Sequence, residues 1–327
     1  MPSESNLNIN DIAERAGVSI ATVSRYMNGH LEKMSQKTAE NIQKIINETG
    51  YVPNASAVQL MTRQSRLVAV MAANVDDYFS TEFFKGASSI LEANQFTGVL
   101  FDTDSDEARE LSLLARIGHQ NFDGLIIQPL TNDADKLRGA LKANLPIVVI
   151  DREFETDVFD SVVTDNQQAI ERVGKAYREA GFKQAVVITE PINGISTREE
   201  RWQGVQNIFP DAEMINVTAH TMNSEKVYET LREKLTNRQK TLVVVFKERI
   251  LLSLLPTLIR HGELIEQIAL TGFADTALAK VIDPKMKLIQ QDPFLMGATA
   301  AELLLKQILK QGQDGAPEKI VIAAKYR

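Results

Sequence analysis

The chain has 327 residues, of which 44% are hydrophobic and 24% charged, and its net charge is -7. This composition is that of a globular protein large enough for two or three domains. The absence of cysteine excludes disulfides and thiolate chemistry, and the four histidines show no metal-ligand spacing. No apolar run reaches the roughly 18 residues that cross a membrane, and residues 1–10 lack the apolar stretch of a secretory signal. We therefore expect a cytoplasmic protein without a metal or other cofactor.

Residues 1–50 predict three short helices. Asn8 and Asp11 have the spacing of a capping box, and Gly17 suits the left-handed position that ends a first helix. Ser19 is expected to cap a second helix, and apolar residues at helical spacing predict a third between about residues 35 and 50. Two helices joined by a tight turn and followed by a third indicate a small helix-turn-helix domain.

The second helix is expected to keep a mixed polar face outside the core. With Val23 and Met27 inward, the outward residues are Ile20, Ala21, Thr22, Ser24, Arg25 and Asn28. Hydroxyl and amide groups bind phosphate oxygens, a guanidinium binds guanine, and small apolar side chains pack on thymine methyl groups. This face favours major-groove binding, and the alternative is a three-helix module that binds protein. Charge does not decide between them, because residues 1–66 carry seven basic and six acidic side chains.

Several motifs resemble those of the LacI-type family of bacterial transcription regulators, and the resemblance covers essentially the whole chain. The motifs are Asp11-Ile12-Ala13, AGVS, ATVSR, Asn28-Gly29, TAENIQ, GYVPN and a segment with Gln59-Leu60. The resemblance implies that Ile20, Ala21 and Arg25 read bases. It also implies that Thr22, Ser24 and Asn28 hold phosphates.

The resemblance further implies a hinge helix from about Asn54 to Thr62 that folds on the minor groove. Its DNA contacts would be Asn54, Ala57 and Leu60, with Leu60 levering open a central base step. Such a helix is too short to be stable alone, so it would pair with its twin across a dimer axis. The alternative is a plain linker.

From Arg66 onward, strand patterns alternate with helical patterns. The strand patterns are LVAVMAA, GVLFD, GLIIQP, PIVVID, AVVITE, LVVVF and IALTGF. This alternation predicts an α/β core of two lobes, each a doubly wound parallel sheet, with a ligand cleft at the carboxyl ends of the strands. The resemblance implies the same core, similar to periplasmic binding proteins.

We therefore expect a helix-turn-helix domain at residues 1–53, a hinge helix or linker at 54–65, and an effector-binding and dimerisation core at 66–327. The resemblance implies that the core chain crosses between the lobes three times, and we place the crossings near Asp165, Asp292 and Pro317. Lobe 1 would then contain residues 66–164 and 293–316. Lobe 2 would contain residues 165–292 and 317–327.

Two segments resemble positions that bind effector in the family. Asp151 and Arg152 follow one strand pattern, and Arg201 and Trp202 lie on the first turns of a helical pattern. A carboxylate, a guanidinium and an indole together suit a sugar, because they bind hydroxyl groups and stack on a pyranose face. Each has a structural alternative: a cap for Asp151, an ion pair between lobes for Arg201, and the core for Trp202.

Two further strand ends depart from the family pattern. Lys247 stands where most members have asparagine, and Phe273 is followed by Ala274 and Asp275, whereas members commonly have aspartate directly after the aromatic residue. A lysine in a cleft is costly unless an anion neutralises it. We therefore expect an anionic effector, either a sugar acid of the ketogluconate type or a sugar phosphate. The alternative is that Lys247 faces solvent or pairs with a carboxylate such as Glu248.

Together these features predict a homodimeric repressor of carbohydrate catabolism genes that binds a palindromic operator and responds to a small effector between its lobes. A dimer is expected because a two-fold axis doubles the contacts of one short recognition helix. One alternative is a sugar-binding protein without a DNA role. The other is an enzyme on the same core, but the sequence has no Gly-rich phosphate loop, nucleophile elbow or metal motif, so we expect no enzyme.

Overall fold

A computed structural model describes residues 7–27, 29–51, 64–154, 158–218, 222–235, 239–262, 268–282, 284–309 and 315–327. The chain divides into two compact units, Met1–Ser65 and Arg66–Arg327. Asn28 and the expected hinge helix, with Asn54, Ala57 and Leu60, lie outside the described residues. None of the helices in the described ranges has the length and apolar character needed to cross a bilayer.

Within its described residues, the first unit is helical. Its elements are α1 (Ile9–Ala16), α2 (Ile20–Met27), η1 (Leu31–Lys33) and α3 (Gln36–Thr49). The Asn8 side chain accepts a hydrogen bond from Asn10 N at 2.8 Å, and Asp11 Oδ2 accepts one from Asn8 N at 2.7 Å. Gly17 ends α1 with a φ of 62°. The predicted capping box and helix end are confirmed, and they set the tight turn into α2.

The caps of α2 and α3 also lie where the sequence predicts them. Ser19 Oγ accepts from Thr22 N at 3.2 Å, and Ser35 Oγ accepts from Thr38 N at 3.1 Å. A small core joins the three helices, and its fully buried members are Ile12, Val23 and Ile42. The inward face of α2 is therefore fixed by Val23, which leaves the opposite face of the helix exposed.

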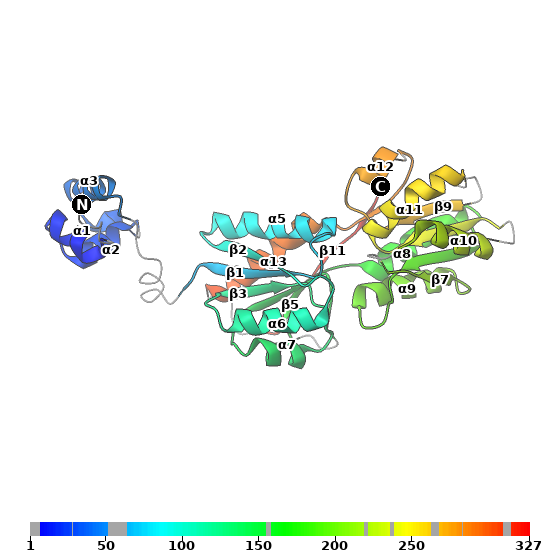
Figure 1. Ribbon diagram of the computed structural model, residues 1–327, viewed down its shortest axis with the longest axis horizontal. Coiled ribbons are helices and arrows are strands. Elements are labelled where there is room, and N and C mark those ends of the chain that lie inside the picture. Colours follow the sequence, from blue (N-terminus) through cyan, green and yellow to red (C-terminus); the bar gives the residue numbers. More distant parts are fainter. Residues whose placement is uncertain are drawn as a thin grey trace. The chain divides into compact units, whose positions relative to one another are not determined.

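In the second unit, lobe 1 is built on a parallel sheet in the order β11-β5-β4-β3-β1-β2. The strands are β1 (Leu67–Ala72), β2 (Thr97–Asp102), β3 (Gly124–Ile127), β4 (Ile147–Ile150), β5 (Asp160–Thr164) and β11 (Lys319–Ile322). One face of the sheet is covered by α5 (Tyr78–Ala93) and α13 (Pro293–Ile308). The other face is covered by α6 (Glu107–Gly118) and α7 (Ala134–Leu141). Figure 1 shows α5 on one side of this sheet and α6 and α7 on the other.

Lobe 2 repeats this design on a smaller parallel sheet in the order β7-β6-β8-β9. The strands are β6 (Gln184–Thr189), β7 (Glu213–Asn216), β8 (Thr241–Val245) and β9 (Ile268–Gly272). One face carries α8 (Asn166–Glu179) and α9 (Ser196–Ile208). The other carries α10 (Ser224–Lys234), α11 (Glu248–His261) and α12 (Leu278–Ile282). A separate antiparallel pair is formed by β10 (Ile289–Gln290) and β12 (Lys325–Tyr326).

The chain passes between the lobes at two of the expected places, Asp165 after β5 and Asp292 before α13. The third expected crossing, near Pro317, is wrong. Strand β11 pairs with β5 in the sheet of lobe 1, with Val321 opposite Val163, so the chain crosses only after β11. Lobe 1 therefore comprises residues 66–164 and 293–322, and lobe 2 comprises 165–292 and 323–327. The lobe of this strand is set by its partner in the ladder, which its own sequence does not reveal.

Candidate functional site

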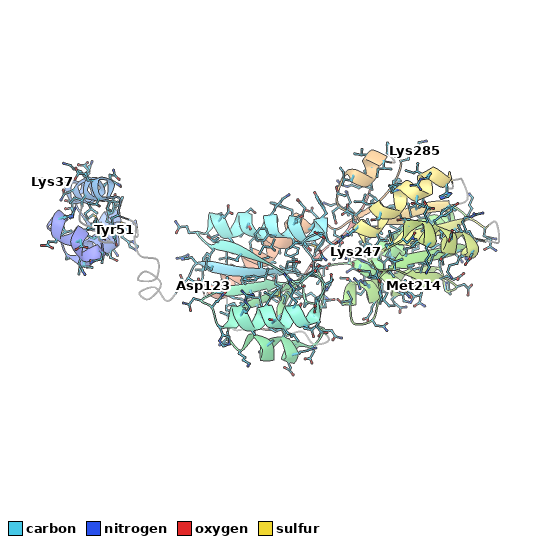
Figure 2. The ribbon with its side chains drawn as sticks, in the orientation of Figure 1. Lys37, Tyr51, Asp123, Met214, Lys247 and Lys285 are labelled. Atoms are coloured by element: carbon cyan, nitrogen blue, oxygen red, sulfur yellow. The ribbon has the colours of Figure 1, made fainter. Side chains whose placement is uncertain are left out.

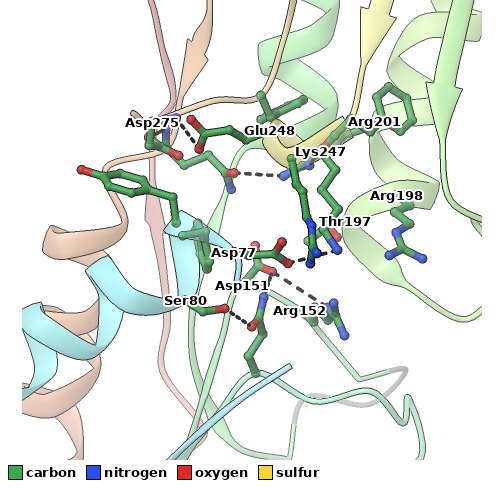
Figure 3. A pocket seen from close by; sticks show the side chains of 17 residues that line it. Asp77, Ser80, Asp151, Arg152, Thr197, Arg198, Arg201, Lys247, Glu248 and Asp275 are labelled. Atoms are coloured by element: carbon green, nitrogen blue, oxygen red, sulfur yellow. Dashed lines mark hydrogen bonds and ion pairs between the residues drawn. The ribbon is translucent and has the colours of Figure 1, made fainter. Parts of the chain in front are cut away.

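A cavity of about 90 Å³ lies between the two lobes, at the carboxyl ends of the strands (Figure 3). Lobe 1 contributes Asp77, Tyr78, Phe79, Ser80, Gln128, Asp151 and Arg152 to its lining. Lobe 2 contributes Thr197, Arg198, Arg201, Phe246, Lys247, Glu248, Arg249, Phe273, Asp275 and Gln291. This is the position at which open parallel sheets bind ligands, because each strand ends in a loop that faces the cleft.

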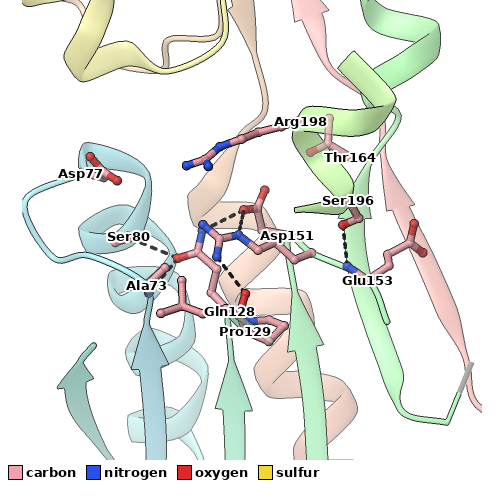
Figure 4. A network of polar contacts seen from close by, with 12 residues as sticks. Ala73, Asp77, Ser80, Gln128, Pro129, Asp151, Glu153, Thr164, Ser196 and Arg198 are labelled. Carbon is pink, nitrogen blue, oxygen red and sulfur yellow. Dashed lines mark hydrogen bonds and ion pairs between the residues drawn. The ribbon is translucent and has the colours of Figure 1, made fainter. Parts of the chain in front are cut away.

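Gln128 connects the strand ends of lobe 1 (Figure 4). Its side-chain oxygen accepts hydrogen bonds from Ala73 N at 3.1 Å and from Ser80 Oγ at 3.4 Å. Its amide donates to Asp151 Oδ2 at 2.7 Å. These bonds fix the orientation of the amide and hold the Asp151 carboxylate at the cavity wall.

A strained turn after β4 directs two predicted site residues to the cavity. Asp151 has a φ of 69°, a left-handed conformation that costs a non-glycine residue of order 1–2 kcal/mol. The turn is held by Asp151 N, which donates to Val162 O at 2.9 Å, and by Arg152 N, which donates to Ile150 O at 2.8 Å. Strain of this kind in a surrounding rigid sheet is typical of binding sites.

The guanidinium of Arg152 is buried beside the carboxylate of Asp151. Its Nη1 donates to Pro129 O at 2.8 Å, while its Nε lies 3.9 Å from Asp151 Oδ2 and has no hydrogen-bond partner among the described residues. Burial lowers the pKa of Arg152, and the charge of Asp151 opposes this shift.

Arg201 extends from α9 into the centre of the cavity wall. Its Nε donates to Asn166 Oδ1 at 2.8 Å, its Nη1 to Phe246 O at 2.6 Å, and its Nη2 to Gln291 Oε1 at 3.2 Å. The guanidinium stacks 3.5 Å from the ring centroid of Phe273. Burial lowers its pKa to about 10 against the opposing charge of Asp151. Asn166 and Gln291 lie next to the crossings at Asp165 and Asp292. The hydrogen bonds of Arg201 therefore connect these two crossings to the cavity wall.

Two carboxyl groups of lobe 2 bind backbone N–H groups at the cavity. Glu248 accepts from Asp275 N at 3.3 Å and from Thr276 N at 3.1 Å. Asp275 Oδ1 accepts from Gln291 N at 2.6 Å and from Asp292 N at 3.1 Å. Burial raises the pKa of Glu248 to about 7 and that of Asp275 to about 6, although these hydrogen bonds oppose the shift. Both groups therefore change charge near neutral pH.

The expectation that an effector anion neutralises Lys247 is wrong, because carboxylates of the protein pair with it, as the alternative had it. Lys247 lies at the junction of the lobes (Figure 2), where its Nζ is 3.0 Å from Asp77 Oδ2 and 3.3 Å from Glu190 Oε2. The carboxylate named as the alternative partner, Glu248, instead faces the backbone of residues 275 and 276. The partners of Lys247 come from distant segments, so the sequence around position 247 gave no signal of them.

Trp202 does not line the cavity. Its side chain is partly buried against the core beneath α8 and α9, which also contains Val205 and Phe209. Successive residues of a helix point about 100° apart, so a helix that aims Arg201 into the cavity turns Trp202 toward another side. Its expected contact with the effector is replaced by the structural alternative, a position in the core.

The structure also brings residues to the cavity that the sequence did not single out. Those with polar or charged side chains include Asp77, Ser80, Gln128, Thr197, Arg198 and Gln291. Gln128 directly follows the strand pattern GLII, so its position at a strand end was a usable signal. The others lie on helices or crossings, where the sequence does not indicate which face meets the cleft. Within the described residues, no group of three or more His, Asp or Glu side chains is placed to hold a metal ion.

A second candidate site is the outward face of α2 in the first unit. Ile20 is 47% exposed, Ala21 and Arg25 are exposed, and Thr22 and Ser24 are partly buried. The side chains expected to contact DNA therefore lie outside the core that contains Val23. Asn28, the sixth member of this face, is outside the described residues.

Comparison with known proteins matches both units. Residues 8–54 match the family model "Bacterial regulatory proteins, lacI family", and residues 68–314 match the model "Periplasmic binding protein domain". The chain is 30% identical to the HTH-type transcriptional regulator KdgR of Bacillus subtilis (strain 168) over 324 residues, which are 97% of this chain and 95% of that protein. The chain belongs to the LacI family of bacterial regulatory proteins.

Solved structures agree with this assignment. A LacI transcriptional regulator from Lactobacillus brevis is 42% identical, with a TM-score of 0.75, and covers 80% of this chain and 99% of its own. A lac repressor dimer bound to operator and the anti-inducer ONPF has a TM-score of 0.83 at 22% identity and covers 98% of both chains. The helix-turn-helix headpiece and the two-lobe α/β core are therefore those of the LacI family.

Proposed function

We propose that this protein is a homodimeric repressor that binds a palindromic operator and controls carbohydrate catabolism genes. The observation that carries the proposal is the exposed face of α2, where Ile20, Ala21 and Arg25 project from a helix held by the capped turn at Gly17. In this role these three side chains read bases in the major groove. Thr22 and Ser24 bind phosphates, together with Asn28.

The expected hinge contacts belong to the same proposal. Asn54, Ala57 and Leu60 contact the minor groove, with Leu60 as the wedge. A dimer is supported by the length of α2, eight residues, because one such helix reaches only a few base pairs. The lac repressor, whose fold this chain shares, is described as a dimer bound to operator.

The cavity between the lobes is the proposed effector site. Asp151, Arg152, Arg201, Lys247, Phe273 and Asp275 line it, and we assign the effector contacts to these residues. The effector is a small sugar-derived anion, a sugar acid or a sugar phosphate. Effector binding changes operator affinity because the ligand stabilises one arrangement of the lobes over another.

The same proposal places the protein in the cytoplasm, where its operator is, and gives the core a binding role rather than a catalytic one. Support for binding comes from the way the cavity side chains are engaged. Arg201 has all three of its guanidinium nitrogens in hydrogen bonds, and Glu248 and Asp275 bind backbone N–H groups. Such groups hold a ligand or a lobe in place.

Recovery of DNA tests the proposed function most directly. Full-length protein is mixed with fragmented genomic DNA of its source organism, and the bound fragments are sequenced. We expect a palindromic sequence in the recovered fragments, and an Arg25→Ala protein as control should recover it with a relaxed preference at one base position per half-site. Fragments without a shared sequence would contradict the DNA-binding role and favour a sugar-binding protein without one.

A further inference from the structure

Three guanidinium groups line the cavity (Figure 3). Arg152 comes from lobe 1, and Arg198 and Arg201 come from the first turns of α9 in lobe 2. All three line the same cavity, and the charge of Arg198 lowers the pKa of both Arg152 and Arg201, after the larger effect of burial. Like charges in one cavity repel each other where little water screens them.

Carboxylates lie near these three charges, among them Asp151, Asp275 and Glu190, but they do not satisfy every guanidinium nitrogen. The nitrogens of Arg201 donate to two amide oxygens and a backbone carbonyl, none of which is charged. Arg198 pairs with Glu190, but Glu190 also accepts from Lys247. Arg152 faces Asp151 only across 3.9 Å, and its buried Nε lacks a hydrogen-bond partner among the described residues. A buried donor of this kind is costly to leave unpaired, so it indicates a missing acceptor.

A second unpaired atom belongs to Asp77, another lobe 1 residue of the lining, whose charge also acts on Arg152. Asp77 Oδ2 is paired with Lys247, whereas Asp77 Oδ1 is buried and has no hydrogen-bond partner among the described residues. A carboxylate oxygen accepts only, so its missing partner is a donor. The cavity thus has an unused N–H donor on Arg152 and an unused acceptor on Asp77.

We propose that the anionic group of the effector binds between Arg152 and Arg198, and that a hydroxyl group of the same molecule donates to Asp77 Oδ1. This inference rests on the proposed effector role of the cavity and specifies its ligand as a hydroxylated carboxylate or phosphate. Arg152 Nε and the edge of Arg198 supply charge-assisted hydrogen bonds to the anion. Lys247 is not the anion-binding residue, because two carboxylates, Asp77 and Glu190, already hold it, whereas Arg198 only shares Glu190 with it.

The two arginines belong to different lobes, so the anion also bridges the lobes. Without an anion, Arg152 and Arg198 repel each other across the cleft, whereas Arg249 and Lys247 of lobe 2 pair with Asp76 and Asp77 of lobe 1. A bound anion reverses the sign of the interaction at the arginines only. A bound anion therefore favours the arrangement in which the two lobes lie together around the ligand. A neutral sugar of the same shape favours that arrangement less.

Calorimetry and thermal unfolding of the full-length protein test this assignment. The anionic probes are gluconate, glucuronate and fructose 6-phosphate, and their neutral counterparts are sorbitol, glucose and fructose; the carboxylate and phosphate arms separate the two anion classes. We expect at least one anion to bind and to raise Tm. Arg152→Gln and Arg198→Gln should each weaken its binding roughly 10- to 100-fold and change binding of the neutral counterpart much less.

Arg260→Gln is the control, since it removes a guanidinium of lobe 2 that pairs with Glu225 and is not part of the cavity lining. It should leave anion binding within about twofold of the parent. If Arg198→Gln does not fold, as its Tm would show, Arg198→Lys replaces it and should weaken binding less than glutamine does. Hexanoate, a carboxylate without hydroxyl groups, should bind at least tenfold more weakly than the preferred hydroxylated anion.

Several results would overturn the inference. These are anion binding that survives in both arginine variants, equal losses for the anion and its neutral counterpart, or no response to any anion by a protein that recovers its operator. Hexanoate binding equal to that of the hydroxylated anion would remove the role of Asp77. Failure to recover a palindrome from genomic DNA would instead contradict the proposed function, so the two failures are distinguishable.

Discussion

Arg25 is the exposed cation on the recognition face of α2, and it follows the buried Val23 by two positions. A guanidinium at this place is suited to guanine, which offers two acceptors at its major-groove edge. We expect Arg25→Ala to weaken operator binding by about 1–3 kcal/mol and to relax the preference at one base position per half-site. Binding measurements on a set of operators, each changed at one base pair, would show this.

Lys37 is the matched control for this prediction. It is exposed in the first turn of α3 and is expected to contact phosphate. Lys37→Ala should weaken binding to all DNA sequences alike. It should also reduce the slope of log K against log salt concentration by about one, the loss of one phosphate contact. An Arg25→Ala protein with the base preferences of the parent would contradict the helix-turn-helix model of recognition.

Glu200 is a half-buried carboxyl group near the junction of the lobes. Burial raises its pKa to about 7, and the nearby charge of Glu153 adds to the shift although Asn166 donates to Glu200 at 3.1 Å. The folded protein therefore binds a proton that the unfolded chain releases above its ordinary pKa. The stability that this proton gives is complete below about pH 4.5 and is lost as the pH rises through about 7.

Glu200→Gln keeps an acceptor for Asn166 and removes the titration. We expect the Tm of the variant to fall less than that of the parent between pH 5 and pH 8. At pH 8 the variant should have a Tm roughly 2–4 °C above that of the parent. Glu179→Gln, on the exposed end of α8, should follow the parent. Parallel Tm curves for parent and Glu200→Gln would show that Glu200 does not titrate in this range.

Residues whose role depends on distant partners mark the limit of prediction at this scale. Asp151, Arg201 and Asp275 could be placed at the cleft because they follow strand ends or open a helix. The partners of Lys247 could not, because Asp77 and Glu190 reach it from other loops. A charge in a sequence shows that a counter-charge is needed, but the fold decides whether a ligand or the protein supplies it.

At the scale of elements, α5 and α13 pack with their backbones in contact. A Cβ on Gly297 would lie 1.9 Å from Phe83 O, and a Cβ on Gly86 would lie 2.0 Å from Phe294 O. We expect Gly297→Ala to force these helices apart and to cost about 3 kcal/mol, which lowers Tm by roughly 6–12 °C. Thermal unfolding of the full chain would measure this.

Gly139, inside α7, is the control for Gly297, because nothing lies within 4 Å of an added Cβ there. Gly139→Ala should be neutral or stabilise by up to about 1 kcal/mol through helix propensity. A Gly297→Ala protein as stable as the Gly139→Ala protein would mean that α5 and α13 can separate without loss.

Elements with local signals were predicted well, and elements defined by pairing were not. Asn8, Gly17 and Ser35 act on their own helix ends, and the seven apolar strand patterns all form strands. Strand β5 has only five residues and begins with a polar pair, so it has no long apolar run. The largely apolar sequence of β11, KIVI, is typical of a strand, but its neighbour β5 decides its lobe.

At the scale of the whole molecule, the proposed regulator binds DNA and effector through different parts of the chain. A substitution in the DNA contacts should therefore leave effector binding unchanged. Leu60→Ala keeps helix propensity but removes the proposed wedge. We expect operator affinity and operator bending to fall while effector binding by the core is unchanged. Bending assays on the operator, combined with effector titration of the variant, would measure both quantities.

The interpretation of Leu60 depends on the bending result. A variant that bends the operator as the parent does would remove the wedge role, even if its affinity fell. A loss of effector binding would indicate a wider effect of the substitution on the core.

The placement of α13 and β11 also has a consequence for biosynthesis. The ribosome makes β1 to β5 first, yet Met296, Leu303 and Leu304 of α13 complete one half of the lobe 1 interior, and β11 covers the edge of β5. Until these segments emerge, a nascent chain carries an open apolar sheet beside a lobe 2 that is already nearly complete. The lobe begun first is therefore completed only after nearly all of the other lobe has been made, and its open sheet is exposed to aggregation during this interval.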